Sequence, residues 1–251
     1  MPPSTGREDT RAAWVVHRRP YRDTSLLLEL LTHDHGRIGA VARGARAQRS
    51  RWRGVLEPFQ PVLVSWQGRG ELLTLTGAEA GGRPLRFPGT RLAAAFYLSE
   101  LVLRLLRRDD PAPDIFFAYG AALQALAGSG EAEDVPLRLF EKRLLQALGY
   151  GLLLHATADT GAAVDHRRSY RYILEYGPVD TATQTGGLLI SGEALQALHR
   201  EQFEDSALRA EMQRLTGAAL RLYIGDRPLY SRSLYQSLRR RPRSANEETP
   251  P

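Results

Sequence analysis

The stretch GRIGAVAR, Gly36–Arg43, alternates between two kinds of side chain with a period of two. One face carries the small or branched apolar residues Ile38, Ala40 and Ala42. The opposite face carries Arg37, Gly39, Val41 and Arg43. Alternation of this kind predicts a β-strand with one face in a core, and Gly39 would allow the sharp bend that strands of small barrels need.

Four more runs around this stretch share its character and are separated by Gly, Pro, Asp or His turn signals. They are AWVVHRR (Ala13–Arg19), TSLLLELLT (Thr24–Thr32), PVLVSWQ (Pro61–Gln67) and ELLTLTGA (Glu71–Ala78). Five short strands in about seventy residues suit a closed barrel of the OB type, with an SH3-like barrel as the alternative. The aromatic residues Trp14, Phe59 and Trp66 are expected in its core.

A Pro/Gly-rich segment, RPLRFPG (Arg83–Gly89), separates these strands from a part with helical periodicity. Helices are expected from Thr90, Asp114, Pro136, near Ser191, Ser206 and Ser231. The segment 150–190 loses that period and contains short β-like pieces. The predicted fold is therefore α+β: an OB barrel domain over residues 1–82, an α-helical domain over 83–241 with an irregular or β insertion at 150–190, and a disordered tail over 242–251.

The chain has 251 residues, no cysteine and a net charge of +6. The absence of cysteine excludes disulfides and cysteine-ligated metal centres. No apolar run approaches the ~20 residues that span a bilayer, so a cytoplasmic protein without a membrane partner is expected. The charge is uneven, because residues 1–86 hold 14 basic and 8 acidic side chains. A local excess of this kind favours a face that binds a polyanion.

The excess is greatest in VARGARAQRSRWRGV, Val41–Val55, which has five arginines and no acid. Guanidinium groups bind phosphate in bidentate fashion, and flat side chains stack on bases of single-stranded nucleic acid. We therefore predict a DNA-binding site made of Arg37, Arg43, Arg46, Arg49, Arg51, Trp52 and Arg53. A merely solvated charged loop is the alternative reading.

Signs of catalysis are weak. The phosphate-binding P-loop, the dinucleotide fingerprint and the serine-hydrolase elbow are all missing. Asp109 and Asp110 lie at a helix end beside a proline, and His33 and His35 lack the helical spacing of a zinc pair. No catalytic residue, metal site or cofactor is expected, although an enzyme with an unrecognised site stays an open alternative.

Several separated blocks, in order, resemble the RecO family of bacterial DNA-repair recombination mediators. They are Arg19–Ala80, LRLFEKRLLQALGYG (Leu137–Gly151), YRY (Tyr170–Tyr172), FEDSALRAEMQRL (Phe203–Leu215) and GDRPLYSRSLYQSLRR (Gly225–Arg240). The resemblance implies an OB domain followed by a helical domain and no nucleotide hydrolysis.

The same resemblance implies partners. They are single- and double-stranded DNA, the C-terminal tail of the single-stranded DNA-binding protein, RecR, and a functional link to RecA, in the nucleoid-associated cytoplasm. Many family members carry a four-cysteine zinc site after the LGYG-like segment, and here only His155 stands near one ligand position. The chain therefore resembles the zinc-free branch. From the residues alone, an RNA-binding OB module in translation or RNA processing is the alternative function.

Overall fold

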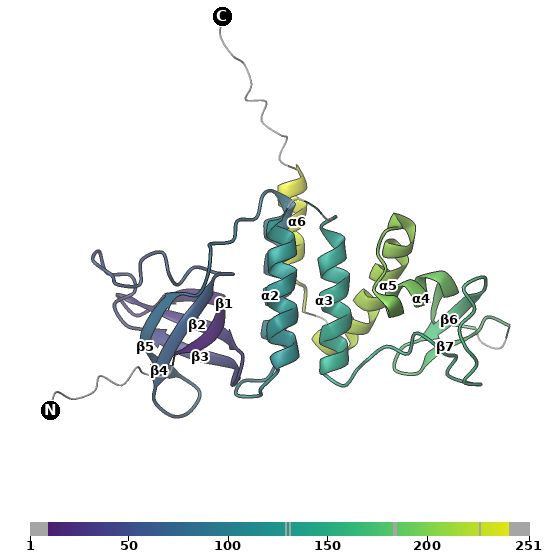
Figure 1. Cartoon of the computed structure of the whole chain (residues 1–251), viewed down its shortest axis with the longest axis horizontal. Helices are drawn as coiled ribbons and strands as arrows, with labels where there is room; N and C mark the ends of the chain where they lie inside the picture. The colour runs from purple at the N-terminus through teal and green to yellow at the C-terminus, as the bar shows by residue number, and fades with distance from the viewer. Residues whose placement is uncertain (1–9, 129, 131, 183–184, 226, 241–251) are drawn as a thin grey trace, which may run out of the picture.

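The computed structural model describes residues 10–128, 130, 132–182, 185–225 and 227–240. A five-stranded barrel comes first in the chain, and a helical region with a small second sheet follows it. The parts lie along one long axis: the barrel at one end, α2 and α3 in the middle, and α4 with β6 and β7 at the other end (Figure 1). The predicted α+β architecture is confirmed. The expected tail over 242–251 lies outside the described residues.

The barrel is closed in the strand order β1-β2-β3-β5-β4. Its strands are β1 (Arg11–Tyr21), β2 (Ser25–Thr32), β3 (Gly36–Ala42), β4 (Pro61–Gln67) and β5 (Leu73–Ala80). Every pairing is antiparallel except β3 with β5, which is parallel, and β1 closes the barrel on β4. This is the connectivity of an OB-type barrel rather than of an SH3-like one.

The alternation predicted for β3 is confirmed. Its inward face contributes Ile38, Ala40 and Ala42 to the barrel core, where they meet residues such as Leu28 and Val64. These side chains are at most 1% exposed, and the removal of their apolar surface from water is the main stabilising contribution of the barrel.

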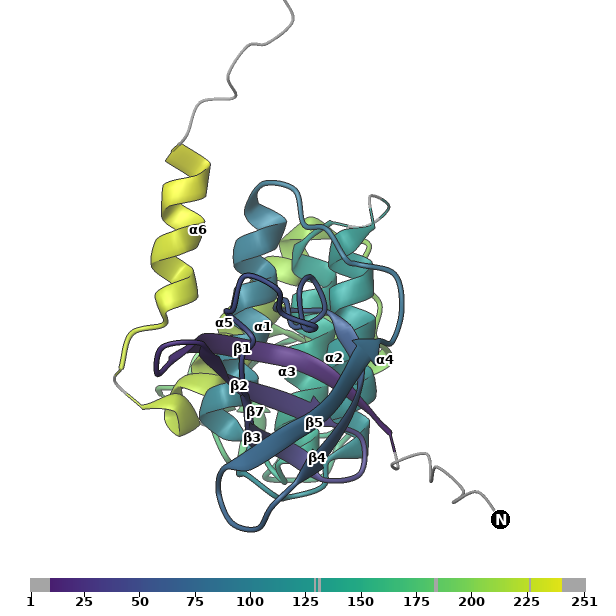
Figure 2. The same cartoon turned by 90° about the vertical axis from the view of Figure 1, so that its left-hand side faces the viewer.

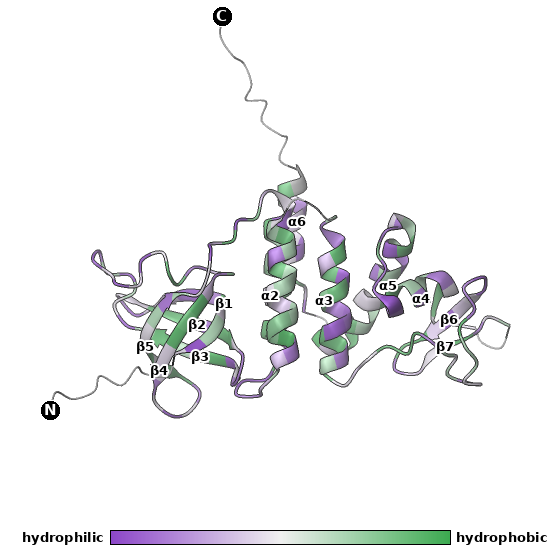
Figure 3. Cartoon of the chain, viewed as in Figure 1, coloured by the Kyte–Doolittle hydropathy of each residue, from purple (hydrophilic) through white to green (hydrophobic). Residues whose placement is uncertain are grey.

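The helices begin within two residues of the predicted positions. They are α1 (Thr90–Leu105), α2 (Pro113–Ala127), α3 (Asp134–Ala147), α4 (Gly192–Arg200), α5 (Ser206–Ile224) and α6 (Tyr230–Arg240). Helix α5 starts at an N-cap, Asp205, whose carboxylate accepts the backbone N–H groups of Ala207 and Leu208. Figure 3 shows α2 mostly in the hydrophobic colour, as expected for a helix in the middle of the molecule.

The expected β-like insertion contains a three-stranded antiparallel sheet in the order β7-β6-β8. Its strands are β6 (Ser169–Ile173), β7 (Gly177–Asp180) and β8 (Leu188–Ser191). Tyr170 and Tyr172 of β6 pack against α4 and α5 in a separate apolar cluster. Burial raises the pKa of the Tyr172 hydroxyl to about 12.

The barrel and the helices share one apolar core. Trp14 and Phe59 are buried, as predicted, but in this shared core and not in the barrel interior. Trp66 packs against the barrel interior. The ring of Trp14 meets Tyr119 of α2 edge-on, with 6.1 Å between centroids. A Cβ atom at Gly120 would lie 2.7 Å from Trp14, so only glycine allows this approach.

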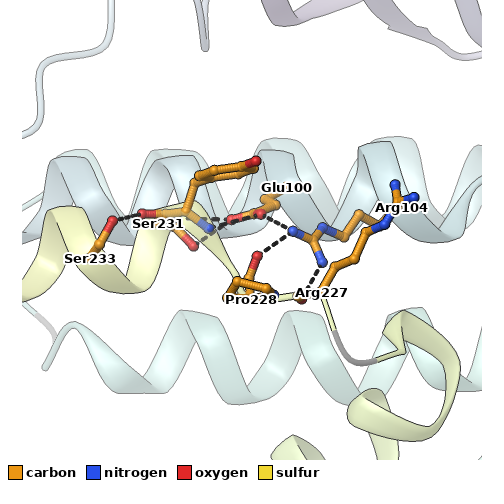
Figure 4. Close-up of polar contacts among 7 residues, drawn as sticks. Glu100, Arg104, Arg227, Pro228, Ser231 and Ser233 are labelled. Carbon is orange, nitrogen blue, oxygen red and sulfur yellow. Dashed lines mark hydrogen bonds and ion pairs between the residues drawn. The ribbon is translucent and has the colours of Figure 1, made fainter.

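Helix α6 packs along α1 and stands apart from the rest of the molecule (Figure 2). Glu100 of α1 accepts the backbone N–H groups of Tyr230 and Ser231, each at 3.0 Å, and so caps the start of α6. Arg104 donates to Glu100 and to the carbonyl oxygens of Arg227 and Pro228 (Figure 4). The start of α6 and the segment before it are therefore attached to α1 by hydrogen bonds from an ion pair within α1.

Candidate nucleic-acid interface

The basic loop, Arg43–Val55, leaves the end of β3 and returns toward β4 through a series of turns. Gly44 and Gly54 near its two ends have φ angles of 68° and 76°, which favour glycine. The backbone N–H of Arg46 donates to the carbonyl of Thr24 at 2.7 Å. The loop is thereby tied to the turn between β1 and β2.

All five arginines of the basic loop are exposed. Arg46 donates to the carbonyl of Arg22 at 3.3 Å, and Arg51 donates to the carbonyl of Thr76 at 3.0 Å. Within the described part of the chain, none of the five forms an ion pair with a carboxylate. Their positive charge is therefore available to an external anion.

Trp52 lies in a different place from the one that its predicted stacking role requires. The indole is 5% exposed and belongs to the barrel core, together with Leu56. Its Nε1–H donates to the carbonyl of Arg43 at 3.1 Å. The guanidinium carbon of Arg51 lies 4.2 Å from the ring centroid, a cation–π arrangement that covers the ring. In this structure Trp52 fixes the loop and presents no free face to a base.

Arg37 also lies away from the basic loop and does not extend it. Its guanidinium forms an ion pair with Glu29 of β2 at 2.9 Å and donates to the carbonyl of Leu106 at 3.1 Å. Arg108, just after α1, contacts the other oxygen of the same carboxylate. Glu29 thus joins two arginines where the barrel meets the helical region.

The same contacts cover part of the outer face of β2 and β3, the face that in many OB folds receives the ligand. Leu31 on this face is fully buried among the helices. The guanidinium of Arg108 lies so near Gly39 that a Cβ atom there would be 3.0 Å from it. Gly39 therefore makes room for Arg108, a reason that the sequence reading did not include. The basic loop, by contrast, remains exposed and cationic.

Sequence reasoning missed Glu29, Arg108 and the turn residue Arg22. The sequence does contain a signal for Glu29, because Glu29 is the only acid in the apolar run SLLLELLT, which lies beside β3. A lone carboxylate in a half-buried strand needs a cationic partner. The contact with Arg108, 79 positions away in the chain, has no local signal.

Metal ligands do not gather in the described residues, where no group of three His, Asp or Glu side chains lies within ligating distance. His155, the one residue near an expected ligand position, lies beside His199 with 5.4 Å between ring centroids. Among the described helices, none has the length and apolar character needed to cross a membrane.

An OB-type barrel with an exposed cationic loop, joined to a helical region, defines a class of proteins suited to bind nucleic acid. The protein-family model for the N-terminal part of recombination protein O matches residues 8–82. The family model for its C-terminal part matches residues 86–233. The chain belongs to the RecO family of DNA repair and recombination proteins.

Close relatives support this assignment over nearly the whole chain. The DNA repair protein RecO of Alkalilimnicola ehrlichii is 52% identical over 242 residues, which are 95% of each chain. The RecO proteins of Nitrosococcus oceani and Haemophilus influenzae are 45% and 41% identical, each over 91% of this chain and at least 93% of the relative. Of the functions left open by the residues alone, family membership favours DNA repair over an RNA-processing module.

Proposed function

We propose that this chain is a recombination mediator that binds single- and double-stranded DNA through its basic loop and anneals complementary strands. The observation that carries the proposal is the group of five exposed arginines, which form no ion pair within the described chain. Crowded guanidinium groups repel one another, and a row of phosphates relieves this repulsion. The proposed contacts are made by Arg43, Arg46, Arg49, Arg51 and Arg53.

Annealing requires that two strands be brought together with their bases free to pair. A loop that holds phosphates and leaves bases unread meets this requirement, because phosphate contacts carry no sequence information. Burial of Trp52 supports the same reading, since a protein that stacks bases tightly would hinder their pairing. The proposal therefore rests on the arginines alone.

The finer partners follow from family membership. We propose that the helical domain, residues 83–241, contacts the acidic, apolar C-terminal tail of the single-stranded DNA-binding protein. With RecR, the protein would help to load RecA onto coated single strands in the nucleoid-associated cytoplasm. We propose that the protein catalyses no reaction. We also propose that residues 1–82 form the DNA-binding domain.

An annealing assay with complementary oligonucleotides tests the central proposal. The variant replaces all five loop arginines by alanine. The control variant removes the same charge from exposed arginines outside the loop: Arg167, Arg200, Arg214, Arg221 and Arg227. Annealing should fall at least tenfold in the loop variant and stay within about threefold in the control. Equal losses in both variants would show a general charge effect and contradict the proposed site.

A second assay tests the proposed partner with the full chain. A fluorescent peptide with the acidic tail sequence should bind the wild-type protein and the loop variant equally, because the tail is proposed to bind the helical domain. Loss of peptide binding in the loop variant alone would mean that the tail and DNA share the loop.

A further inference from the structure

A cleft of about 280 Å³ lies where the outer face of β1 and β2 meets α1. It is lined by His17, Arg19, Leu27, Glu29, Arg37 and Leu103. The cleft is separate from the basic loop, none of whose residues lines it. Its walls combine two apolar side chains with four charged or titratable ones, so the cleft is polar and suits a charged ligand.

The charged groups of the cleft differ in what they can offer a ligand. Glu29 is already paired with Arg37 and with Arg108, so the lining residues Glu29 and Arg37 form a fixed wall. Arg19 is exposed and has no ion-pair partner in the described part of the chain. An anion entering the cleft would therefore meet one free guanidinium, beside the apolar surfaces of Leu27 and Leu103.

The strand register places Arg19 on the same outer face of the barrel as the start of the basic loop. Arg19 pairs with Leu27, and Leu27 pairs with Val41, two residues before Arg43. Two strand spacings and one two-residue step separate Arg19 from Arg43, on the order of 12 Å between their Cα atoms. A short piece of single-stranded DNA can span that distance between two phosphates.

We propose that this cleft takes one nucleotide of a single strand whose neighbouring phosphates lie on the basic loop. This inference rests on the proposed DNA binding by that loop. Arg19 binds the phosphate, and Leu27 and Leu103 contact the sugar and base. A base that is paired in a duplex carries its partner with it and does not fit, so the cleft makes the protein prefer single strands over duplex.

The chain has no cysteine, so one introduced thiol can be labelled alone. In Leu103→Cys, the thiol lines the cleft, and its reaction with a maleimide should slow at least fivefold when a saturating oligo-dT is bound. A duplex of the same length, also at saturation, should change this rate less than twofold. The control variant Leu222→Cys, at an exposed position on α5, should react at the same rate with and without DNA.

The outcomes are distinct. Bound oligo-dT that leaves the reaction of Leu103→Cys unchanged overturns the cleft proposal and leaves the basic loop in place. Failure of the wild-type protein to bind oligo-dT at all overturns the proposed function and the cleft together, and it is read separately by fluorescence anisotropy.

A second variant keeps the test open if Leu103→Cys does not fold. Arg19→Ala should weaken oligo-dT binding about three- to tenfold and leave duplex binding within twofold. Arg200→Ala, which removes the same charge from α4, a helix at the other end of the molecule from the barrel (Figure 1), should change neither. An equal loss for single strand and duplex in Arg19→Ala would make Arg19 an ordinary phosphate contact and overturn the nucleotide site.

Discussion

The indole nitrogen of Trp52 donates a hydrogen bond to the backbone carbonyl of Arg43, at a distance of 3.1 Å. This bond connects the first arginine of the basic loop with the aromatic residue nine positions later, which is buried in the barrel. The loop therefore closes on itself. The backbone that carries its arginines is therefore already ordered without DNA, which would reduce the conformational entropy lost in the proposed DNA binding.

Replacement of Trp52 separates this structural role from base stacking. Trp52→Ala removes a buried indole and should lower the free energy of unfolding by about 3–5 kcal/mol. Trp52→Phe keeps an aromatic ring and loses the hydrogen bond, and it should cost only about 1–2 kcal/mol. Urea denaturation measures both values. Single-strand affinity of Trp52→Phe should stay within twofold of wild type, and a large selective loss would restore the stacking role.

The salt dependence of DNA binding reports how many loop arginines contact phosphate. Each phosphate neutralised on a single strand contributes about −0.7 to the slope of log affinity against log salt, so five arginines predict a slope of about −3.5. The five-alanine loop variant should give a slope no steeper than about −0.7, the contribution of Arg19 alone. Circular dichroism at the same salt concentrations verifies its fold. A slope unchanged from wild type would assign the phosphate contacts elsewhere.

The ion pairs of Glu29 should stabilise the junction between barrel and helices. Glu29→Gln leaves Arg37 and Arg108 close together without a neutralising carboxylate, and it should cost about 2 kcal/mol or more in urea denaturation. Glu57→Gln is the matched control, because Glu57 pairs with Arg18 in a more exposed setting and should cost less than about 1 kcal/mol. Similar costs for both variants would contradict a special role for the junction.

The sequence predicted the barrel well because the residues that specify each strand and turn lie within that strand or turn. Alternation in β3 identified the core face, and glycine and proline marked the turns around it. The path of the basic loop is different, because whether Trp52 points inward depends on how residues 43–55 fold over the barrel end. The pairing of Arg37 was also hidden, since its partners come from a neighbouring strand and from the end of α1. Local pattern therefore located the cationic loop and misplaced two of its expected members.

Acid should weaken the attachment of α4 to α3. Burial opposes ionisation of Glu201, but hydrogen bonds from Arg143 and Lys142 outweigh it and hold the pKa of this carboxyl below its usual value of 4.5. The folded state therefore binds fewer protons at Glu201 than the unfolded chain does. Its contribution to stability is complete above pH 4.5 and is lost as the pH falls through the lower, folded-state pKa.

Glu201→Gln checks this directly. At pH 7 it should reduce the free energy of unfolding by less than about 1 kcal/mol, because the pair is partly exposed. The difference between wild type and variant should shrink as the pH falls below 4.5. A difference that stays constant over this range would mean that the carboxylate charge is not what holds the two helices together.

The barrel lies at one end of the long axis of the molecule and the small β6–β8 sheet at the other, with α2 and α3 between them (Figure 1). The packed junction of Trp14 with Tyr119, together with the ion pairs of Glu29, joins the barrel to the adjacent helices. A strand on the loop and a second macromolecule on the far end would not compete for space. Under the proposed function, the length of the molecule would set how far apart DNA on the basic loop and a partner at the β6–β8 end are held.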